Sequence, residues 1–322
     1  MLSAPLSAFR LFFATVAFVL TGVAGAQPKV VAYVPNWTDL KVFAPQIDYA
    51  KITHINLAFE NPRDAEGSLS FHEGDEVVIK EAHAHGVKVL VSIGGGSASE
   101  NEGMRKRYFE LIGAAKRAGF VARLAAYVSA HEFDGMDVDL EGPAINGDYG
   151  AFIQELAAAL KAKNKLLTAA LSKGYGGKDV PEAALGCFDF VNVMAYDATG
   201  PWQPKKGGPH SSLEFAQQNL DYWLGRGMAR ERLVLGVPFY GWGFGKAFRQ
   251  EEYCYADLVK QDARAAEVDE TGDTIWYNGL RTMKAKARLV REQGFGGVMI
   301  WSLNSDAKGE LSLLSALHGA LN

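Results

Sequence analysis

Residues 133–142 read FDGMDVDLEG, and this stretch holds the most informative pattern in the chain. Successive side chains of a β-strand point to opposite faces, so three apolar side chains share one face while Asp137, Asp139 and Glu141 share the other. Burying three like charges is costly, and neighbouring carboxyl groups raise one another's pKa. The stretch therefore predicts a buried strand whose last acid, Glu141, is protonated and able to donate a proton to a leaving group.

Apolar, β-branched runs recur along the rest of the chain and alternate with stretches of helical periodicity. The eight runs are 30–34, 52–59, 87–93, 133–140, 166–171, 188–194, 233–237 and 297–301. The helical stretches are 75–85, 120–130, 148–163, 211–224 and 282–293. We expect N-caps at Asp148 and Ser211, and C-caps at Gly86 and Gly294.

Eight strand-helix units over residues 27–322 predict an α/β protein, a closed (β/α)8 TIM barrel forming a single domain. In such a barrel Glu141 lies at the C-terminal end of the fourth strand, where active sites are found. An open doubly wound sheet would have a glycine-rich loop after its first strand. The segment Pro35–Trp37 contains no glycine, so we favour the barrel.

The composition excludes several classes of protein. The 322 residues are 48% hydrophobic and 22% charged, which is typical of a soluble globular protein. The net charge of −4 provides no basic surface for nucleic acid or an anionic membrane. Cys187 and Cys254 do not form a zinc-ligand pair, and they could form a disulfide or remain buried thiols.

The first 26 residues are interpreted as a secretory signal peptide. Arg10 is followed by an apolar run over 11–20, and Ala24-Gly25-Ala26 provides a small-residue cleavage site before Gln27. The run is short for a membrane anchor, which needs about 20 apolar residues. We therefore expect a secreted or periplasmic protein with no membrane attachment after signal cleavage.

Several motifs resemble those of the family 18 glycoside hydrolases, the chitinases and their relatives. Residues 134–141 resemble the signature D-x-x-D-x-D-x-E, and residues 91–95, VSIGG, resemble the third-strand motif S-x-G-G. Residues 194–197, MAYD, match the sixth-strand motif M-x-Y-D, and Trp301 stands where the family has an eighth-strand tryptophan. The resemblance covers nearly the whole mature chain. Within the family, the chain most resembles a small bacterial-type catalytic domain without the α+β insertion.

This resemblance implies retaining hydrolysis of β-1,4 links between N-acetylglucosamine units, with the acetamido oxygen of the substrate as nucleophile. Glu141 would be the general acid that later activates water. Asp139 would orient the acetamido group and stabilise the oxazolinium cation, while Asp137 tunes Asp139. Tyr196 would hydrogen-bond the acetamido carbonyl, and Asp197 would position the distorted sugar.

Further residues are expected to bind the sugar chain at the C-terminal end of the barrel. Trp301 would form the floor under the sugar at the cleavage site, because an aromatic face suits a pyranose ring. The other expected binding residues are Tyr33, Phe59, Gly95, Met194, Trp202, Tyr240 and Trp242. Trp242 replaces an arginine found in many relatives, which would add a stacking surface. The short segment 243–293 predicts a shallow groove that lacks one wall.

Other functions are less compatible with the sequence. An EF-hand calcium loop over 137–148 would need an entering helix, whereas this segment has a strand period. His83 and His85 would point to different faces of a helix, and no G-x-S-x-G motif is present. We expect no metal, no cofactor, and a monomer whose partners are N-acetylglucosamine oligosaccharides or polysaccharide.

Two alternative activities remain open. One is an endo-β-N-acetylglucosaminidase acting on N-glycan cores. The other is a catalytically weak chitin-binding lectin, although the retained acids Glu141 and Asp139 favour an enzyme.

Overall fold

The chain forms a closed barrel of eight parallel strands, as predicted. The computed structural model describes Met1, residues 27–272 and residues 274–322, so most of the predicted signal peptide lies outside the described residues. The barrel strands are β1 (Lys29–Pro35), β2 (His54–Ala58), β3 (Lys88–Gly94), β4 (Gly135–Asp139), β5 (Leu166–Leu171), β6 (Phe190–Val193), β7 (Leu233–Pro238) and β12 (Gly297–Trp301). Each pairs in parallel with its chain neighbours, and β12 closes the barrel against β1.

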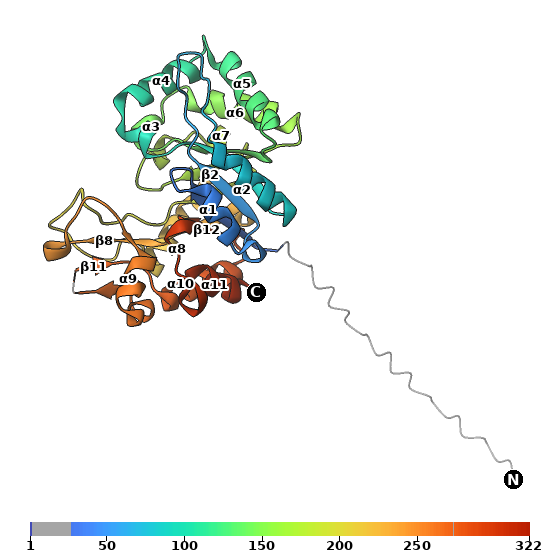
Figure 1. Ribbon diagram of the computed structural model, residues 1–322. Coiled ribbons are helices and arrows are strands. Elements are labelled where there is room, and N and C mark those ends of the chain that lie inside the picture. Colours follow the sequence, from blue (N-terminus) through green and yellow to red (C-terminus); the bar gives the residue numbers. More distant parts are fainter. Residues whose placement is uncertain (2–26, 273) are drawn as a thin grey trace.

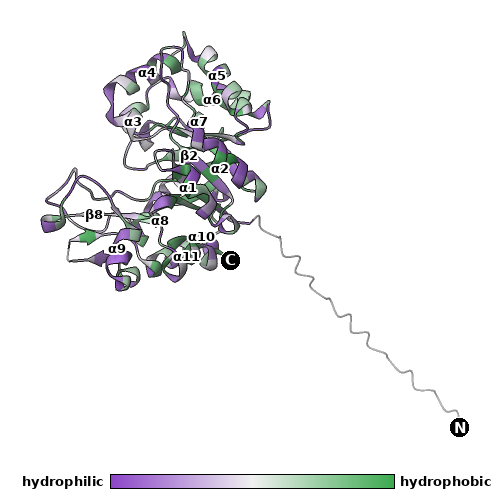
Figure 2. Ribbon diagram, viewed as in Figure 1, coloured by the Kyte–Doolittle hydropathy of each residue, from purple (hydrophilic) through white to green (hydrophobic). Residues whose placement is uncertain are grey.

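Helices pack around this barrel (Figure 1). They are α1 (Leu40–Phe43), α2 (Glu73–Ala84), α3 (Gly96–Glu100), α4 (Glu102–Ile112), α5 (Arg117–Ala130), α6 (Tyr149–Lys161), α7 (Glu182–Leu185), α8 (Leu213–Gly225), α9 (Tyr255–Gln261), α10 (Leu280–Gln293) and α11 (Leu313–Leu321). The five predicted helices correspond to α2, α5, α6, α8 and α10. Helices such as α2 contain both hydrophobic and hydrophilic residues (Figure 2). In α2 the hydrophobic side chains of Val78, Ile79 and Ala82 are buried. Among the described residues, none of the helices has the length and hydropathy needed to cross a membrane.

One predicted helix cap is wrong by a single residue. Ser212, not Ser211, caps α8, because its hydroxyl accepts a hydrogen bond from the amide of Phe215 at 3.1 Å. The hydroxyl of Ser211 instead donates to the carbonyl of Ala195 at 2.7 Å. Gly294 ends α10 in the left-handed conformation, with φ 68°, as expected of a C-cap glycine. Cys187 and Cys254 are free thiols.

The alternation predicted for the acidic strand is observed. Met136, Val138 and Leu140 are fully buried in the core between barrel and helices. Asp137 and Asp139 are buried on the other face, inside the barrel. Strand β4 ends at Asp139, but Glu141 keeps an extended backbone with φ −135° and ψ 165°, so the alternation continues to the third acid.

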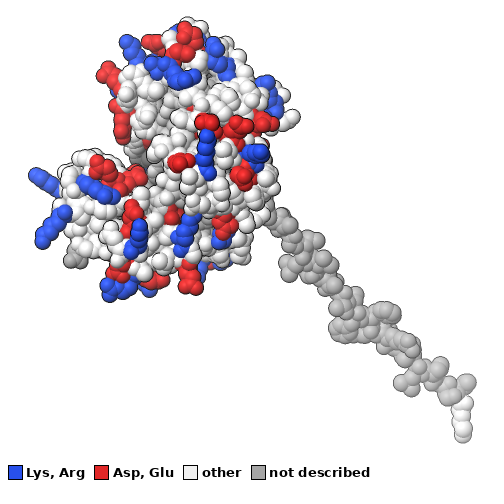
Figure 3. All heavy atoms as spheres, viewed as in Figure 1, with Lys and Arg blue, Asp and Glu red and all other residues white. Residues whose placement is uncertain are grey.

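The segment between β7 and α10 contains a small sheet that the sequence analysis did not predict. Its antiparallel strands are β8 (Tyr240–Gly243), β9 (Tyr253–Cys254), β10 (Glu270–Thr271) and β11 (Ile275–Trp276). Strands of two residues are too short to produce a readable alternation. Together with α9, this sheet forms a lobe on the left of Figure 1, below α3 and α4, and a hollow separates the two parts in Figure 3. Between β7 and α10 the described part of the chain thus adds only this short sheet, α9 and single 3-10 turns beside the barrel.

The glycines of the third-strand motif let β3 and β4 approach closely. Gly94 has φ +106°, and a Cβ at this position would lie 2.3 Å from the backbone oxygen of Asp139. Gly95 has φ +66°, and its amide donates to the same oxygen at 2.8 Å. No side chain fits at Gly94 without moving the acidic strand.

We expect Gly94→Ala to lower the free energy of unfolding by about 2 kcal/mol, because the new methyl group adds both backbone strain and a steric clash. Urea denaturation measures this change. Gly119→Ala is the matched control: Gly119 lies in α5 with no atom within 4 Å of the added Cβ, and this change should be neutral or stabilising by up to about 1 kcal/mol. Equal stability of the two variants would contradict the close approach.

Candidate active site

The first acid of the row, Asp137, is held at the centre of the barrel. Its Oδ2 accepts hydrogen bonds from the hydroxyls of Tyr33 at 2.6 Å and Ser92 at 2.8 Å. Its Oδ1 accepts from the hydroxyl of Thr168 at 2.6 Å and from the Asn192 amide nitrogen at 3.2 Å. Burial raises the pKa of Asp137, and these hydrogen bonds oppose that shift. The four donors fix its carboxyl group in one orientation.

The second acid, Asp139, is buried. Among the described residues, its Oδ1 has no hydrogen-bond partner. Burial raises its pKa well above the usual range, and the charges of Glu141 and Asp137 add to this effect. A buried carboxyl group with an unused acceptor is available to hydrogen-bond an amide of a bound molecule.

The third acid, Glu141, lies at the mouth of the barrel. Burial raises its pKa to about 7, and the negative charges of Asp197 and Glu100 act in the same direction. At neutral pH this group therefore exists in both protonation states. A carboxyl group with such a pKa can donate a proton in one step of a reaction and accept one in the next.

Asp197, from the loop after β6, faces these acids across the mouth. Its Oδ1 accepts hydrogen bonds from the hydroxyl of Tyr240 at 2.6 Å and from Nε1 of Trp242 at 2.8 Å. Nδ1 of the buried His210 lies 3.3 Å from the same oxygen. Trp242 is only 7% exposed, so its ring is mostly covered and its polar edge holds Asp197. This placement differs from the open stacking surface expected from the sequence.

Tyr196 and Met194 lie beside the acids at the end of β6. The ring of Tyr196 packs edge-on against Tyr240, with ring centroids 6.1 Å apart. Burial raises the pKa of Tyr196 well above its usual value, as do the charges of Asp139 and Asp197, so its hydroxyl remains protonated and able to donate. Met194 is 9% exposed and packs in the apolar cluster at the barrel axis.

Aromatic rings line the mouth on β1 and β12 and in the residues that directly follow β1 and β2. Trp301 lies 5.5 Å from Tyr33 and stacks on Phe59 at 5.7 Å between ring centroids. Phe59 in turn stacks on Trp37 at 6.4 Å, and Trp37 is 67% exposed. Gly95 makes room for the ring of Phe59, because a Cβ at position 95 would lie 2.4 Å from that ring. The stacked rings form an apolar floor that leads from the acids to the surface.

Trp202 and Tyr240 complete the set of residues expected at the mouth. Trp202 is 55% exposed and packs edge-on against Trp242, with ring centroids 5.9 Å apart. Tyr240 is almost fully buried and contributes its hydroxyl to Asp197. Of the expected binding residues, Tyr33, Tyr240 and Trp242 therefore support the site from beneath, while Trp202 offers an exposed ring.

Three residues near the acids were not identified from the sequence. Burial raises the pKa of Glu252 to about 7, and the neighbouring Trp301 acts in the opposite direction. His210 contacts Asp197, and Tyr175 packs over Gly142, the residue after Glu141. All three lie in loops with no regular period, so no local pattern indicates them.

A group of metal-ligand type lies outside this site. Ligand atoms of Glu60, His72 and Asp75 are within 4.8 Å of one another. Nδ1 of His72 lies 2.5 Å from Glu60, and Asp75 accepts from the amide of His72 at 3.2 Å, closing a capping box at the start of α2. These contacts account for the arrangement as a helix cap.

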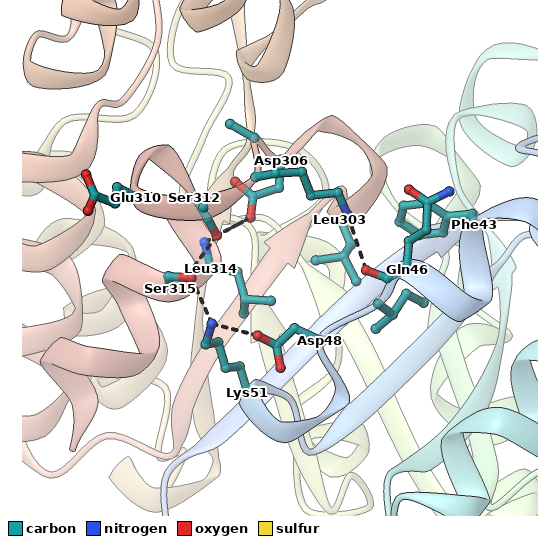
Figure 4. Close-up of a pocket in the computed structure, with 14 residues that line it drawn as sticks. Phe43, Gln46, Asp48, Lys51, Leu303, Asp306, Glu310, Ser312, Leu314 and Ser315 are labelled. Atoms are coloured by element: carbon teal, nitrogen blue, oxygen red, sulfur yellow. Dashed lines mark hydrogen bonds and ion pairs between the residues drawn. The ribbon is translucent and has the colours of Figure 1, made fainter.

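A separate cavity of about 530 Å³ lies between residues 43–51 and residues 303–315 (Figure 4). Among its charged groups, Lys51 pairs with Asp48 at 2.6 Å, and Lys308 donates to the carbonyl of Gln46 at 3.2 Å. None of the acids of the β4 row lines this cavity. The mouth of the barrel is therefore the candidate active site.

Comparison with known proteins identifies the family. The sequence model for "Glycosyl hydrolases family 18" matches residues 29–306. The chain belongs to family 18 of the glycosyl hydrolases. Its assignment as a glycoside hydrolase of chitinase type, made from the sequence motifs, is thereby confirmed.

Individual relatives extend over nearly the whole chain. The GH18 chitinase ChiB from the chitin utilization locus of Flavobacterium johnsoniae is 34% identical, with a TM-score of 0.85, and the match covers 92% of this chain and 94% of that one. A chitinase from Bacteroides thetaiotaomicron is 26% identical, with a TM-score of 0.80, covering 92% and 97%. Chitotriosidase-1 of Mus musculus is 26% identical, covering 92% of this chain and 79% of its own. This family 18 barrel is thus of the compact catalytic-domain type.

We expect Asp197→Asn to bring the pKa of Glu141 below about 7, because the charge of Asp197 is one of the causes that raise it. The asparagine keeps an oxygen that can accept from Tyr240 and Trp242. Carbon-13 NMR titration of the glutamate carboxyl carbons measures the change. Asp221→Asn, in the exposed part of α8, is the control and should leave this pKa unchanged; an unchanged value in Asp197→Asn would refute the coupling.

Proposed function

We propose that this family 18 enzyme hydrolyses β-1,4 links between N-acetylglucosamine units of chitin or chitooligosaccharides, with retention at the anomeric carbon. The observation that carries the proposal is the row Asp137, Asp139 and Glu141, which ends at the barrel mouth in an acid with a pKa of about 7. The stacked rings of Trp301 and Phe59 support it, because their faces suit the apolar face of a pyranose. The similarity to chitinases covering most of their length is consistent with this substrate.

In the first chemical step, the acetamido oxygen of the substrate attacks its own anomeric carbon. The bond from that carbon to the bridging oxygen breaks, and Glu141 gives its proton to the departing oxygen. A cyclic oxazolinium ion remains on the enzyme. Asp139 holds the acetamido N–H through its unpaired Oδ1, and the hydroxyl of Tyr196 donates to the acetamido oxygen.

In the second step, Glu141 works as a base. Its carboxylate removes a proton from water as the water oxygen attacks the anomeric carbon and opens the oxazolinium ring. The acetamido group is restored, Glu141 is protonated again, and the product keeps the original anomeric configuration. Asp137 stabilises the row from below through its four hydrogen bonds, and Asp197 positions the sugar on the other side of the mouth.

We expect the fall of kcat/KM at alkaline pH, the alkaline limb of the pH profile, to report the deprotonation of Glu141. The acid must be protonated when substrate binds, so activity is retained below its pKa and lost as the pH rises through about 7. Initial rates on chitotetraose from pH 5 to pH 9 test this limb, and Asp197→Asn should move it to lower pH. A limb in the same place in that variant would contradict the role of Glu141.

Product analysis by mass spectrometry tests the activity itself. We expect residues 27–322 to release chitobiose from chitotetraose and to leave a high-mannose glycopeptide intact. Glu141→Gln should bind chitotetraose in calorimetry while its kcat falls by about 10²- to 10⁴-fold, because the proton donor is lost. Glu110→Gln, in the exposed part of α4, should retain wild-type rates.

Other outcomes would replace the proposal. Cleavage between the two core N-acetylglucosamines of the glycopeptide would indicate an endo-β-N-acetylglucosaminidase. Binding of chitotetraose by the wild-type chain without cleavage would indicate a lectin, and undiminished hydrolysis by Glu141→Gln would exclude this glutamate as the acid.

A further inference from the structure

Three strongly exposed aromatic rings stand on loops at the C-terminal end of the barrel: Trp37, Tyr175 and Trp202 are 67%, 46% and 55% exposed. Trp37 continues the stack of Phe59 and Trp301. Trp202 packs edge-on against another tryptophan. In the part of the chain that the structure describes, Tyr175 pairs with no other aromatic ring. Packing against other rings therefore does not explain its position.

Tyr175 rests instead on the backbone beside the catalytic acid. Gly142 directly follows Glu141, and a Cβ at Gly142 would lie 2.2 Å from Cζ and 2.3 Å from Cε1 of Tyr175. Only glycine allows the ring to lie this close to the backbone, and Gly142 also has φ +52°. The ring is thus supported from below and exposed above, immediately next to Glu141.

The turn that carries Tyr175 is fixed to the same backbone. The amide of Gly142 donates to the carbonyl of Tyr175 at 3.3 Å, and the amide of Tyr175 donates to the Ser172 hydroxyl oxygen at 3.2 Å. Gly176, with φ +82°, turns the chain so closely that a Cβ there would lie 2.6 Å from the Gly142 nitrogen. A ring held in place before ligand binding loses little conformational entropy when a ligand packs on it.

The barrel order places Tyr175 opposite the stacked rings. In the closed order β5, which precedes Tyr175, is four strands away from β1, which precedes Trp37. Glu141 follows β4, between them around the mouth. A sugar chain that rests on Trp301 and crosses Glu141 consequently reaches Tyr175 on the far side of the acid.

We propose that Tyr175 is a specificity-determining residue, which stacks against the sugar on the leaving-group side of the scissile bond. This inference rests on the proposed hydrolysis of chitooligosaccharides, and it assigns that side of the cleft to the turn after β5. The donor sugar lies over Trp301, and Glu141 protonates the oxygen between the two sugars. Tyr175 then holds the departing unit until it leaves, and holds an acceptor sugar when the reaction runs in reverse.

Two substrates distinguish sugar binding by Tyr175 on the leaving-group side from a general structural role of this residue. Chitotetraose places sugars on both sides of Glu141, whereas the oxazoline of chitobiose is already activated and has no leaving sugar. We expect Tyr175→Ala to lower kcat/KM for chitotetraose about tenfold, since one aromatic stacking contact is lost. Hydrolysis of the oxazoline should stay within twofold of wild type. Tyr175→Phe keeps the ring and should stay within twofold on both substrates.

A third readout uses added chitobiose as acceptor. Tyr175→Ala should transfer the oxazoline to chitobiose less efficiently, so that the ratio of chitotetraose formed to chitobiose formed falls about tenfold. Equal losses on both substrates would overturn the proposal in favour of a structural role for Tyr175, and so would an unchanged kcat/KM for chitotetraose. Failure of the wild-type chain to process either substrate would overturn the proposed hydrolytic function, and this inference with it.

Discussion

The carboxyl group of Asp137 is the interaction on which the rest of the site depends. It accepts hydrogen bonds from Tyr33, Ser92, Thr168 and Asn192, which lie on β1, β3, β5 and β6. A buried carboxyl group without partners would be strongly unfavourable, so the polar groups of four strands must converge on it. The hydrogen bonds from β1 and β6 link strands that are not neighbours of β4 across the barrel interior. Together the four bonds fix the position of the acidic row along the barrel axis.

The rest of the acidic row follows from this anchor. Asp139 and Glu141 follow Asp137 on the same face of the strand. Asp137 is fully hydrogen-bonded, Oδ1 of Asp139 has no partner among the described residues, and Glu141 lies at the mouth. Several carboxyl groups lie close together, and in the described part of the chain no lysine or arginine forms an ion pair with Glu141. Protons are therefore held where they would otherwise be lost at neutral pH. Proton retention is thus a consequence of burial and like charge, and it is what acid catalysis requires.

Local sequence patterns predicted the parts of the molecule that repeat. Eight apolar runs and their intervening helices had the correct order, because burial on a barrel strand and on one helix face leaves a regular period. The small sheet β8 to β11 was missed, since two-residue strands leave no period, and the cap of α8 was misplaced between two adjacent serines.

The sequence by itself determined the barrel, the face on which the three acids lie, and the family to which the chain belongs, because strand alternation and motif spacing are properties of consecutive residues. Only the tertiary structure decided what surrounds those acids. In the folded chain, Trp242 donates a hydrogen bond to Asp197, Glu252 lies near Trp301, and the ring of Tyr175 packs against Gly142. Each of these contacts joins loops far apart in the chain, whose conformations are set by packing against the closed barrel rather than by any local period.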